Sequence, residues 1–240
     1  MTLRFIGEPP RPATEAKVIT YLTNRQLPHG GWPIVPDEDK LDLTETVKAY
    51  IALTYMGVPK NSSLLTRARD QILRHGGAER MNLLLKLYAT LTRIIAWQSI
   101  PLEALLIPPW SSVSTYSIGS FGRLGFTVVL VSRSVDLAEN SPVVTDFEEL
   151  FINKDNVLDD SFIGPFQNPY LHAMCRRLIS LLGVVDNLVP EAVRKWAIKK
   201  VVKKLDNMTN PVSGLFGTGT LTECLLIMYQ KLGLGNSLKV

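Results

Sequence analysis

The sequence has few cysteines and no long hydrophobic run. Its 240 residues include two cysteines, Cys175 and Cys224, too few for a disulfide framework or a cysteine-rich zinc site. No stretch of about 18 apolar residues occurs, so no transmembrane helix is expected, and the N-terminus has no apolar segment of signal-peptide length. We therefore expect a cytoplasmic protein, with peripheral membrane contact left open.

Charge and polarity are moderate. Hydrophobic residues make up 46% of the chain and charged residues 20%, with a mean hydropathy of +0.12, which excludes a disordered chain. The net charge of +4 is too small to indicate a nucleic-acid partner. His29, His75 and His172 are isolated in the sequence, so no metal site is predicted, and no motif indicates an organic cofactor.

Helical periodicity runs through most of the chain. The helix that begins at Asp42 has a capping box, in which Asp42 caps the helix and Glu45 reaches back. Residues 134–168 are rich in Asp, Asn, Pro and Ser and are expected to form a long loop or partly ordered insertion. Because strands and helices do not alternate, the pattern predicts an all-α fold in a single domain over 1–240. The expected helices are 14–25, 42–57, 63–74, 79–97, 115–133, 169–184, 190–207 and 219–232. Residues 126–131 would also suit a strand, but their context among helices favours helix.

Two short segments form a weak internal repeat. Gln26, Gly30 and Trp32 follow one expected helix, and Asn210, Gly214 and Phe216 follow another with the same spacing. Each set reads amide, three residues, glycine, one residue, aromatic, and each precedes an apolar helix. The amide is expected to bond backbone groups at a neighbouring helix end while the aromatic ring stacks on the turn.

The segment Gln26…Gly30-Gly31-Trp32-Pro33 resembles the glutamine–tryptophan motif of squalene–hopene cyclases and related class II triterpene cyclases. The resemblance continues in order through 42–59, 67–91, 100–110 and 114–135, and it is looser from 136 to 240. It implies one (α/α) barrel or toroid of paired helices, namely the second, inserted helical domain of those cyclases. It also implies a linear polyprenyl or triterpene substrate, with neither metal nor organic cofactor.

The family's catalytic acid is absent from the sequence. Those cyclases protonate an alkene with an Asp of a D-x-D-D motif, and this chain contains no such motif. Asp159 and Asp160 are weak candidates for an acid pair, with a solvated loop or helix cap as the alternative. Asp37 and Asp39 could bind a cation, although a polar turn explains them better. Tyr88 falls where the family has an aromatic lining its substrate cavity, and the alternative is a core tyrosine.

A basic helix is expected over 190–208. Val193, Ala197, Val201 and Leu205 are spaced by four and form an apolar stripe, which Trp196 widens. Several lysines lie largely opposite, among them Lys199, Lys200 and Lys203. A basic amphipathic helix with a tryptophan is typical of contact with a membrane surface, whereas the alternative is a surface helix whose stripe faces the core.

Three hypotheses follow from the sequence. The first is a terpene-cyclase-like protein that binds a polyprenyl or triterpene chain and carries out proton-initiated cyclisation. The second is a non-catalytic half of a split or truncated cyclase, which pairs with a separate acid-bearing domain. The third is a membrane-surface lipid-binding helical module. A nucleic-acid partner is not expected under any of them.

Overall fold

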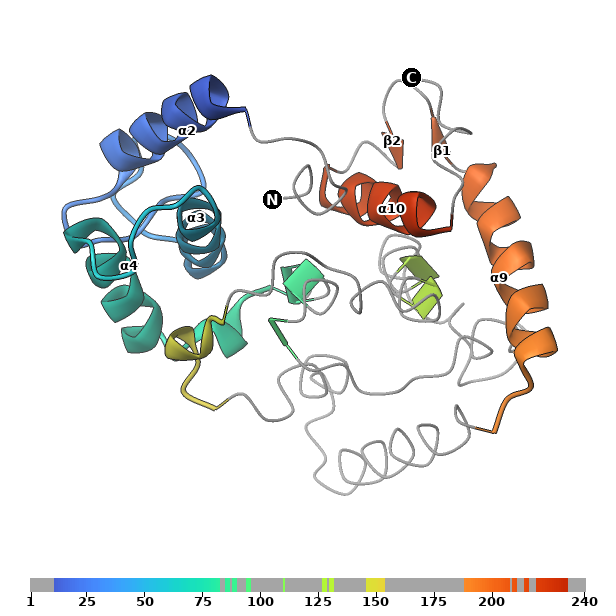
Figure 1. Ribbon diagram of the computed structural model, residues 1–240. Coiled ribbons are helices and arrows are strands. Elements are labelled where there is room, and N and C mark those ends of the chain that lie inside the picture. Colours follow the sequence, from blue (N-terminus) through green and yellow to red (C-terminus); the bar gives the residue numbers. More distant parts are fainter. Residues whose placement is uncertain are drawn as a thin grey trace. The chain divides into compact units, whose positions relative to one another are not determined.

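The computed structural model describes residues 11–82, 146–153, 188–207 and 219–232, together with 85, 86, 88, 89, 94, 95, 110, 127, 128, 130, 131, 209, 210, 214 and 215. The chain divides into two compact units, one of Met1–Lys86 with Val143–Val157 and one of Leu87–Pro142 with Leu158–Val240. Figure 1 labels the α-helices and strands described below. A single domain over 1–240 stays a prediction.

The described residues of the first unit form α-helices and short 3-10 helices. These are α2 (Pro12–Arg25), α3 (Leu43–Tyr55), α4 (Ser63–Arg74), η1 (Ala78–Arg80) and η4 (Glu148–Leu150). The predicted helices 14–25, 42–57 and 63–74 are confirmed within about two residues at each end. Helix α2 begins earlier than predicted, at Pro12, because proline fits the first turn of a helix, where its missing N–H has no partner to lose.

The ends of α3 and α4 follow from local sequence. The Asp42 carboxylate accepts a hydrogen bond from the Glu45 amide at 2.9 Å, as the capping-box prediction required. The second half of that prediction is wrong, because the Asp42 amide already donates to the Trp32 carbonyl and the Glu45 carboxylate binds Lys48. Each helix then stops at a glycine with positive φ, Gly57 after α3 and Gly76 after α4.

The predicted helix over 79–97 is not continuous. Residues 78–80 form η1, and the described helical residues 85, 86, 88 and 89 follow a separate start at Asn82. The Asn82 side chain accepts from the Leu85 amide at 2.9 Å, while the Asn82 amide donates to the Thr44 hydroxyl of α3. Ile94 and Ile95 lie in a bend. A contact with α3 therefore breaks the helix that periodicity alone extends.

The core of the first unit lies between α3, α4 and the segment 146–153. Leu53 of α3 and Leu65 and Ile72 of α4 are fully buried. Phe147 and Leu150 cover them from the distant segment around η4, and the Phe147 ring meets the edges of Tyr50 and Tyr55 at centroid distances of 6.3 and 5.6 Å. This part of the expected insertion 134–168 therefore packs into the first unit.

The second unit repeats the order helix, turn, helix. Helix α9 (Glu191–Asp206) leads into strands β1 (Thr209–Asn210) and β2 (Gly214–Leu215), and α10 (Gly219–Lys231) follows. The strands pair antiparallel, with Asn210 opposite Gly214. The Tyr229 hydroxyl of α10 donates to the Asp206 carboxylate at the end of α9, which ties the two helices together. Buried Cys224 and Met228 belong to the core of this unit.

The all-α prediction is confirmed: the described elements are helical, apart from the two-residue strands and one isolated bridge between Trp32 and Asp42. Residues 127, 128, 130 and 131 are helical, so helix is correct there over strand. The expected helix 169–184 lies outside the described residues. Within the described part of the chain, no helix is both long and apolar enough to cross a bilayer.

Candidate functional site

The turn between α2 and α3 is held by the side-chain amide of Gln26. Its nitrogen donates to the carbonyl oxygens of Gly30 and Leu64, both at 2.8 Å. Its oxygen accepts from the Arg67 guanidinium at 2.6 Å. Because Leu64 and Arg67 both belong to α4, one side chain closes the turn on itself and fastens it to the next helix. This refines the expectation that the amide bonds a neighbouring helix end.

Trp32 joins the same turn to α2 and α3. Its indole nitrogen donates to the Leu22 carbonyl at 2.8 Å, and Leu22 lies in the last turn of α2, where carbonyls lack a helical partner. Its backbone amide donates to the Thr46 hydroxyl of α3 at 3.1 Å. Trp32 is buried, whereas α2 has no buried residue of its own. The indole therefore contributes much of what attaches α2 to the first unit.

Gly30 is required by geometry. Its φ is +109°, and a Cβ atom built at this position would lie 2.7 Å from the Cβ and the carbonyl oxygen of Arg67. A side chain at position 30 would thus meet the backbone of α4 rather than a flexible side-chain end. The glycine lets the turn approach α4 closely enough for Gln26 to reach the Leu64 carbonyl.

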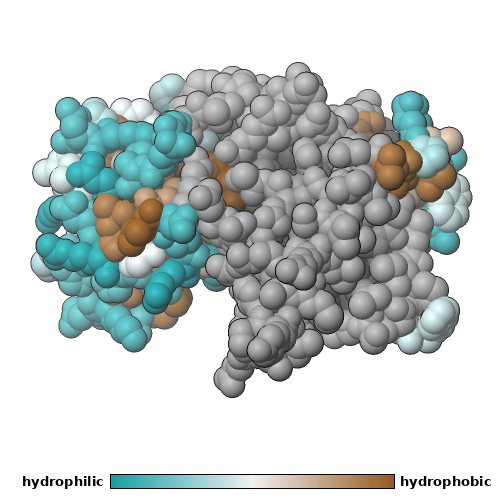
Figure 2. All heavy atoms as spheres, turned by 90° about the horizontal axis from the view of Figure 1, so that it is seen from below, coloured by the Kyte–Doolittle hydropathy of each residue, from teal (hydrophilic) through white to brown (hydrophobic). Residues whose placement is uncertain are grey.

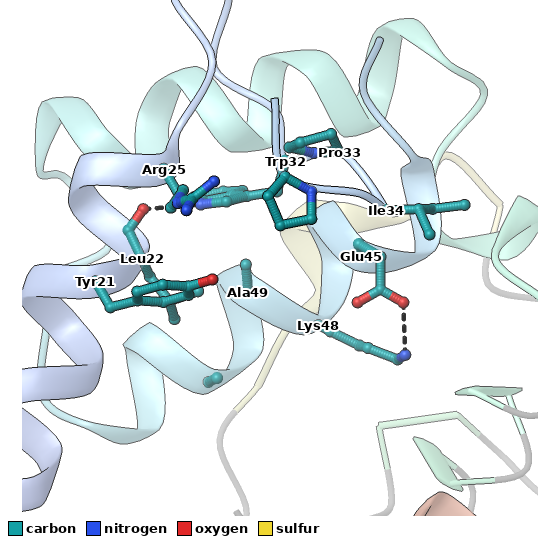
Figure 3. Close-up of a pocket in the computed structure, with 11 residues that line it drawn as sticks. Tyr21, Leu22, Arg25, Trp32, Pro33, Ile34, Glu45, Lys48 and Ala49 are labelled. Atoms are coloured by element: carbon teal, nitrogen blue, oxygen red, sulfur yellow. Dashed lines mark hydrogen bonds and ion pairs between the residues drawn. The ribbon is translucent and has the colours of Figure 1, made fainter. Parts of the chain in front are cut away.

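A small groove opens beside this turn, and the sequence analysis did not anticipate it. Its volume is about 280 Å³, and Figure 3 shows Tyr21, Trp32, Pro33 and Ile34 around it, with the Glu45–Lys48 ion pair (2.7 Å) at its edge. Tyr21 and Ile34 are 55% and 66% exposed, so the rim is apolar and open. The volume is below the roughly 300–1,000 Å³ of typical ligand pockets, so it could hold only a short part of a long hydrocarbon. The lining residues are Tyr21, Leu22, Arg25, Trp32, Pro33, Ile34, Pro36, Glu45, Lys48, Ala49 and Ala52.

A polar cluster fixes segment 146–153 on the first unit. Lys60 binds the Glu149 carboxylate at 2.7 Å, and its ammonium lies 5.1 Å from the centroid of the Phe147 ring. The Tyr50 hydroxyl donates to the same carboxylate at 3.0 Å. Burial, followed by the charge of Glu149, raises the pKa of Tyr50 above its ordinary value, although Arg69 opposes this shift. The Tyr50 hydroxyl therefore stays protonated and serves as a hydrogen-bond donor.

The Glu79 side chain anchors the far end of the same segment. Its carboxylate accepts from the amides of Ile152 and Asn153, at 3.1 and 2.9 Å to the same oxygen. These bonds join η1 to residues more than 70 positions further along the chain. The segment is therefore held at both ends, by charge and aromatic contact at one and by backbone hydrogen bonds at the other.

The other predicted site residues have different outcomes. Tyr88 is helical and 4% exposed, which agrees with either a core or a cavity-lining residue, so its role stays a prediction. Asp159, Asp160 and Phe216 lie outside the described residues. Asp37 is exposed and lies 3.6 Å from Arg25. Among the residues described, no group of three His, Cys, Asp or Glu side chains could hold a metal ion.

The exposure of side chains on α9 corrects one expectation about its apolar stripe. Ala197, Val201 and Leu205 are buried, but Val193 and Trp196 are 41% and 54% exposed. Trp196 therefore lies outside the apolar stripe that it was predicted to widen. The reason is geometric: successive helical residues are about 100° apart, so Trp196 lies about 100° around the helix from buried Ala197. Val193, four residues before Ala197, lies about 40° from it in the same direction, at the edge of the buried face. The Lys200 ammonium lies 5.0 Å from the centroid of the Trp196 ring.

Comparison with known proteins decides the family. The squalene–hopene cyclase N-terminal domain model matches residues 1–239. The chain belongs to the squalene–hopene cyclase family. Its similarity to the squalene–hopene cyclase of Bradyrhizobium diazoefficiens is 28% identity over 232 residues, covering 95% of this chain and 35% of that protein. The squalene–hopene cyclase of Zymomonas mobilis is 30% identical over 240 residues, covering 95% and 34%.

The chain is also similar to a relative with a different printed activity. The dammaradiene synthase of Dryopteris crassirhizoma is 27% identical over 198 residues, covering 79% of this chain and 28% of that protein. The chain thus spans about a third of the length of the curated squalene–hopene cyclases that it matches. The predicted resemblance to class II triterpene cyclases is confirmed, and the helical fold agrees with it.

Proposed function

We propose that this protein is a squalene–hopene-cyclase-like module that binds a linear polyprenyl or triterpene chain and contributes one part of the enclosure for its proton-initiated cyclisation. The observation that carries the proposal is the family match over residues 1–239. The turn at Gln26, Gly30 and Trp32 supports it, because the contacts of these residues hold neighbouring helices together. We assign this turn to the family's glutamine–tryptophan motif. Cyclisation of this kind requires neither a metal ion nor an organic cofactor.

The proton donor is proposed to come from a second domain. The printed sequence has no D-x-D-D motif, and the chain covers only 34% to 36% of the bacterial relatives. An acid-bearing domain, in the same polypeptide or in a separate one, would complete the reaction. Asp159 and Asp160 are the internal alternative, because adjacent carboxylates can raise the pKa of one member of the pair.

Tyr88 is proposed to present an aromatic face to the substrate. An aromatic ring stabilises a passing carbocation through its quadrupole, by about 0.5–2 kcal/mol according to how dry the site is. The near-complete burial of Tyr88 supports a dry setting. Tyr88→Phe keeps the ring and should retain activity, whereas Tyr88→Leu removes it and should lower product formation.

Product analysis tests the proposal. The full chain is incubated with squalene and with shorter prenyl substrates, alone and together with the remaining part of the Zymomonas mobilis cyclase, and extracts are analysed by gas chromatography–mass spectrometry. We expect cyclic product only in the mixture. Product from the chain alone, abolished in Asp159→Asn or Asp160→Asn, would assign the acid to that pair instead. If neither the chain nor the mixture yields product or retains bound squalene, the proposed function is wrong.

The proposed setting is the cytoplasmic face of a membrane, contacted peripherally. A linear polyprenyl or triterpene chain is insoluble in water, so a protein that binds it gains from access to a bilayer. Exposed basic and aromatic residues on α9 support this setting. A membrane-surface lipid-binding module without cyclase function is the second candidate. Vesicle binding without product in any of the mixtures above would favour it.

A further inference from the structure

The net charge of the protein is concentrated on one helix. Helix α9 carries six Lys or Arg residues and two Asp or Glu residues, an excess of four positive charges. The whole chain has a net charge of +4, so the rest of the sequence is balanced. A concentration of this kind attracts anionic surfaces, whereas scattered lysines would not.

The exposed side of α9 combines these charges with apolar contact area. Trp196, Lys199, Lys200 and Lys203 are spaced by three, four and seven residues, so they share one side of the helix, with Val193 one turn earlier. We call these five residues the Trp196 face. All five are exposed, while Ala197, Val201 and Leu205 on the other side are buried. At the right of Figure 2, where α9 lies, hydrophilic residues lie beside a few hydrophobic ones.

The lysines of this face are available to a partner. Lys195, which lies off the face, is bound to Glu191 at 2.7 Å, and Glu191 has a lowered pKa as a result. Lys199, Lys200 and Lys203, by contrast, have no carboxylate within ion-pair distance among the described residues. Lys200 instead lies over the Trp196 ring. Nothing in this part of the helix neutralises the face.

We propose that the Trp196 face docks on an anionic lipid surface, with Trp196 and Val193 entering the headgroup region and the three lysines binding acidic headgroups. This inference rests on the proposed membrane setting but not on cyclisation. Tryptophan favours the membrane–water interface because its ring is apolar and its N–H is polar, and lysines around it add attraction to anionic lipids. Nucleic acid would bind the same lysines, but it offers no apolar layer for Trp196 and Val193.

Vesicle flotation of the full chain tests the proposal, using phosphatidylcholine vesicles with and without phosphatidylglycerol. We expect binding to the anionic vesicles and weak binding to the neutral ones. Lys199→Gln with Lys203→Gln should lower partitioning to anionic vesicles by about 30-fold at low salt, from roughly fivefold per lysine. Lys17→Gln with Lys40→Gln removes the same charge from exposed positions of the first unit and serves as the control, with little expected change.

Fluorescence separates insertion from simple charge attraction. Binding should shift the tryptophan emission of the full chain to shorter wavelength, and Trp196→Phe should remove most of that shift. Since Trp196 is largely exposed, this variant should fold normally, which circular dichroism checks. Equal binding to neutral and anionic vesicles, equal losses in the two lysine pairs, or duplex DNA binding as strong as that to anionic vesicles would overturn the proposal. Product formation in detergent is measured separately, so failure of docking is distinguishable from failure of cyclisation.

Discussion

Gly30→Ala tests whether the turn depends on the close approach of Gly30 to α4. The alanine would adopt a φ of +109° at a cost of about 1–3 kcal/mol. Its Cβ would also lie 2.7 Å from the Arg67 carbonyl oxygen, so α4 or the turn must move, which costs about 1–3 kcal/mol more. We expect a total loss of about 2–6 kcal/mol, a large part of the stability of an ordinary domain.

Gly57→Ala is the matched control. Gly57 also has a positive φ, +89°, but a Cβ built there meets nothing within 4 Å. Its replacement should therefore cost only the backbone strain, about 1–2 kcal/mol. The difference between the two variants isolates the contact with Arg67. The midpoints of urea unfolding, followed by circular dichroism, measure both losses if the m-values are unchanged. Equal losses in the two variants would refute the close-approach argument.

Three further predictions address the contacts of each unit. Trp32→Phe removes the hydrogen bond to the Leu22 carbonyl and should lower the free energy of unfolding by about 1 kcal/mol. Amide hydrogen exchange should become faster in α2 but not in α4. Unchanged exchange in α2 would contradict the conclusion that Trp32 attaches α2 to the first unit. Phe147→Ala should lower the free energy of unfolding by about 3–5 kcal/mol, because a fully buried ring is lost. Glu149→Gln should lower it by less than about 1 kcal/mol, because the ion pair with Lys60 is partly exposed. Urea unfolding compares the two variants, and a larger loss in Glu149→Gln would show that charge holds the segment. Burial raises the pKa of Cys224 to about 12 from 9.0. As pH rises, the thiol therefore loses its proton in the unfolded chain before it does so in the folded protein. The free energy of unfolding should be unaffected below about pH 9 and should fall above it, by at most about 1.4 kcal/mol per pH unit. Cys224→Ala should remove this fall between pH 9 and pH 10, and an unaltered pH profile in that variant would exclude the thiol as its cause.

Local signals in the sequence were sufficient for the long helices. Asp42 and Ser62 cap α3 and α4, and Gly57 and Gly76 end them, so the observed bounds agree with the predicted ones. These signals act over a few residues and depend little on the rest of the fold. The spacing of Gln26, Gly30 and Trp32 likewise identified the turn.

Long-range contacts explain what the sequence could not show. Asn82 begins a new helix because its amide meets Thr44 of α3, and no pattern near Asn82 reveals that contact. The segment around Phe147 looked like a polar loop, yet its burial depends on Tyr50 and Tyr55, about 90 residues earlier. The exposure of Trp196 depended on which side of α9 packs against the core, and the spacing of apolar residues in the helix did not determine that side. The groove is lined by 11 residues from α2, the turn and α3, and no local sequence pattern predicts that these residues meet.

The polar groups of the turn and those of the Trp196 face differ in whether they already have partners within the protein. The Gln26 amide has two N–H donors, both of which bond backbone carbonyls, and its oxygen accepts from Arg67. The single donor of the Trp32 ring is likewise bound to Leu22. Neither side chain has a donor left for a polar ligand, so these polar groups serve to hold the helices together. The lysines of the Trp196 face present the opposite case, because within the described residues no carboxylate binds them. Substitutions at the turn should therefore alter stability first and activity only as a consequence, whereas substitutions on the Trp196 face should alter binding at constant stability.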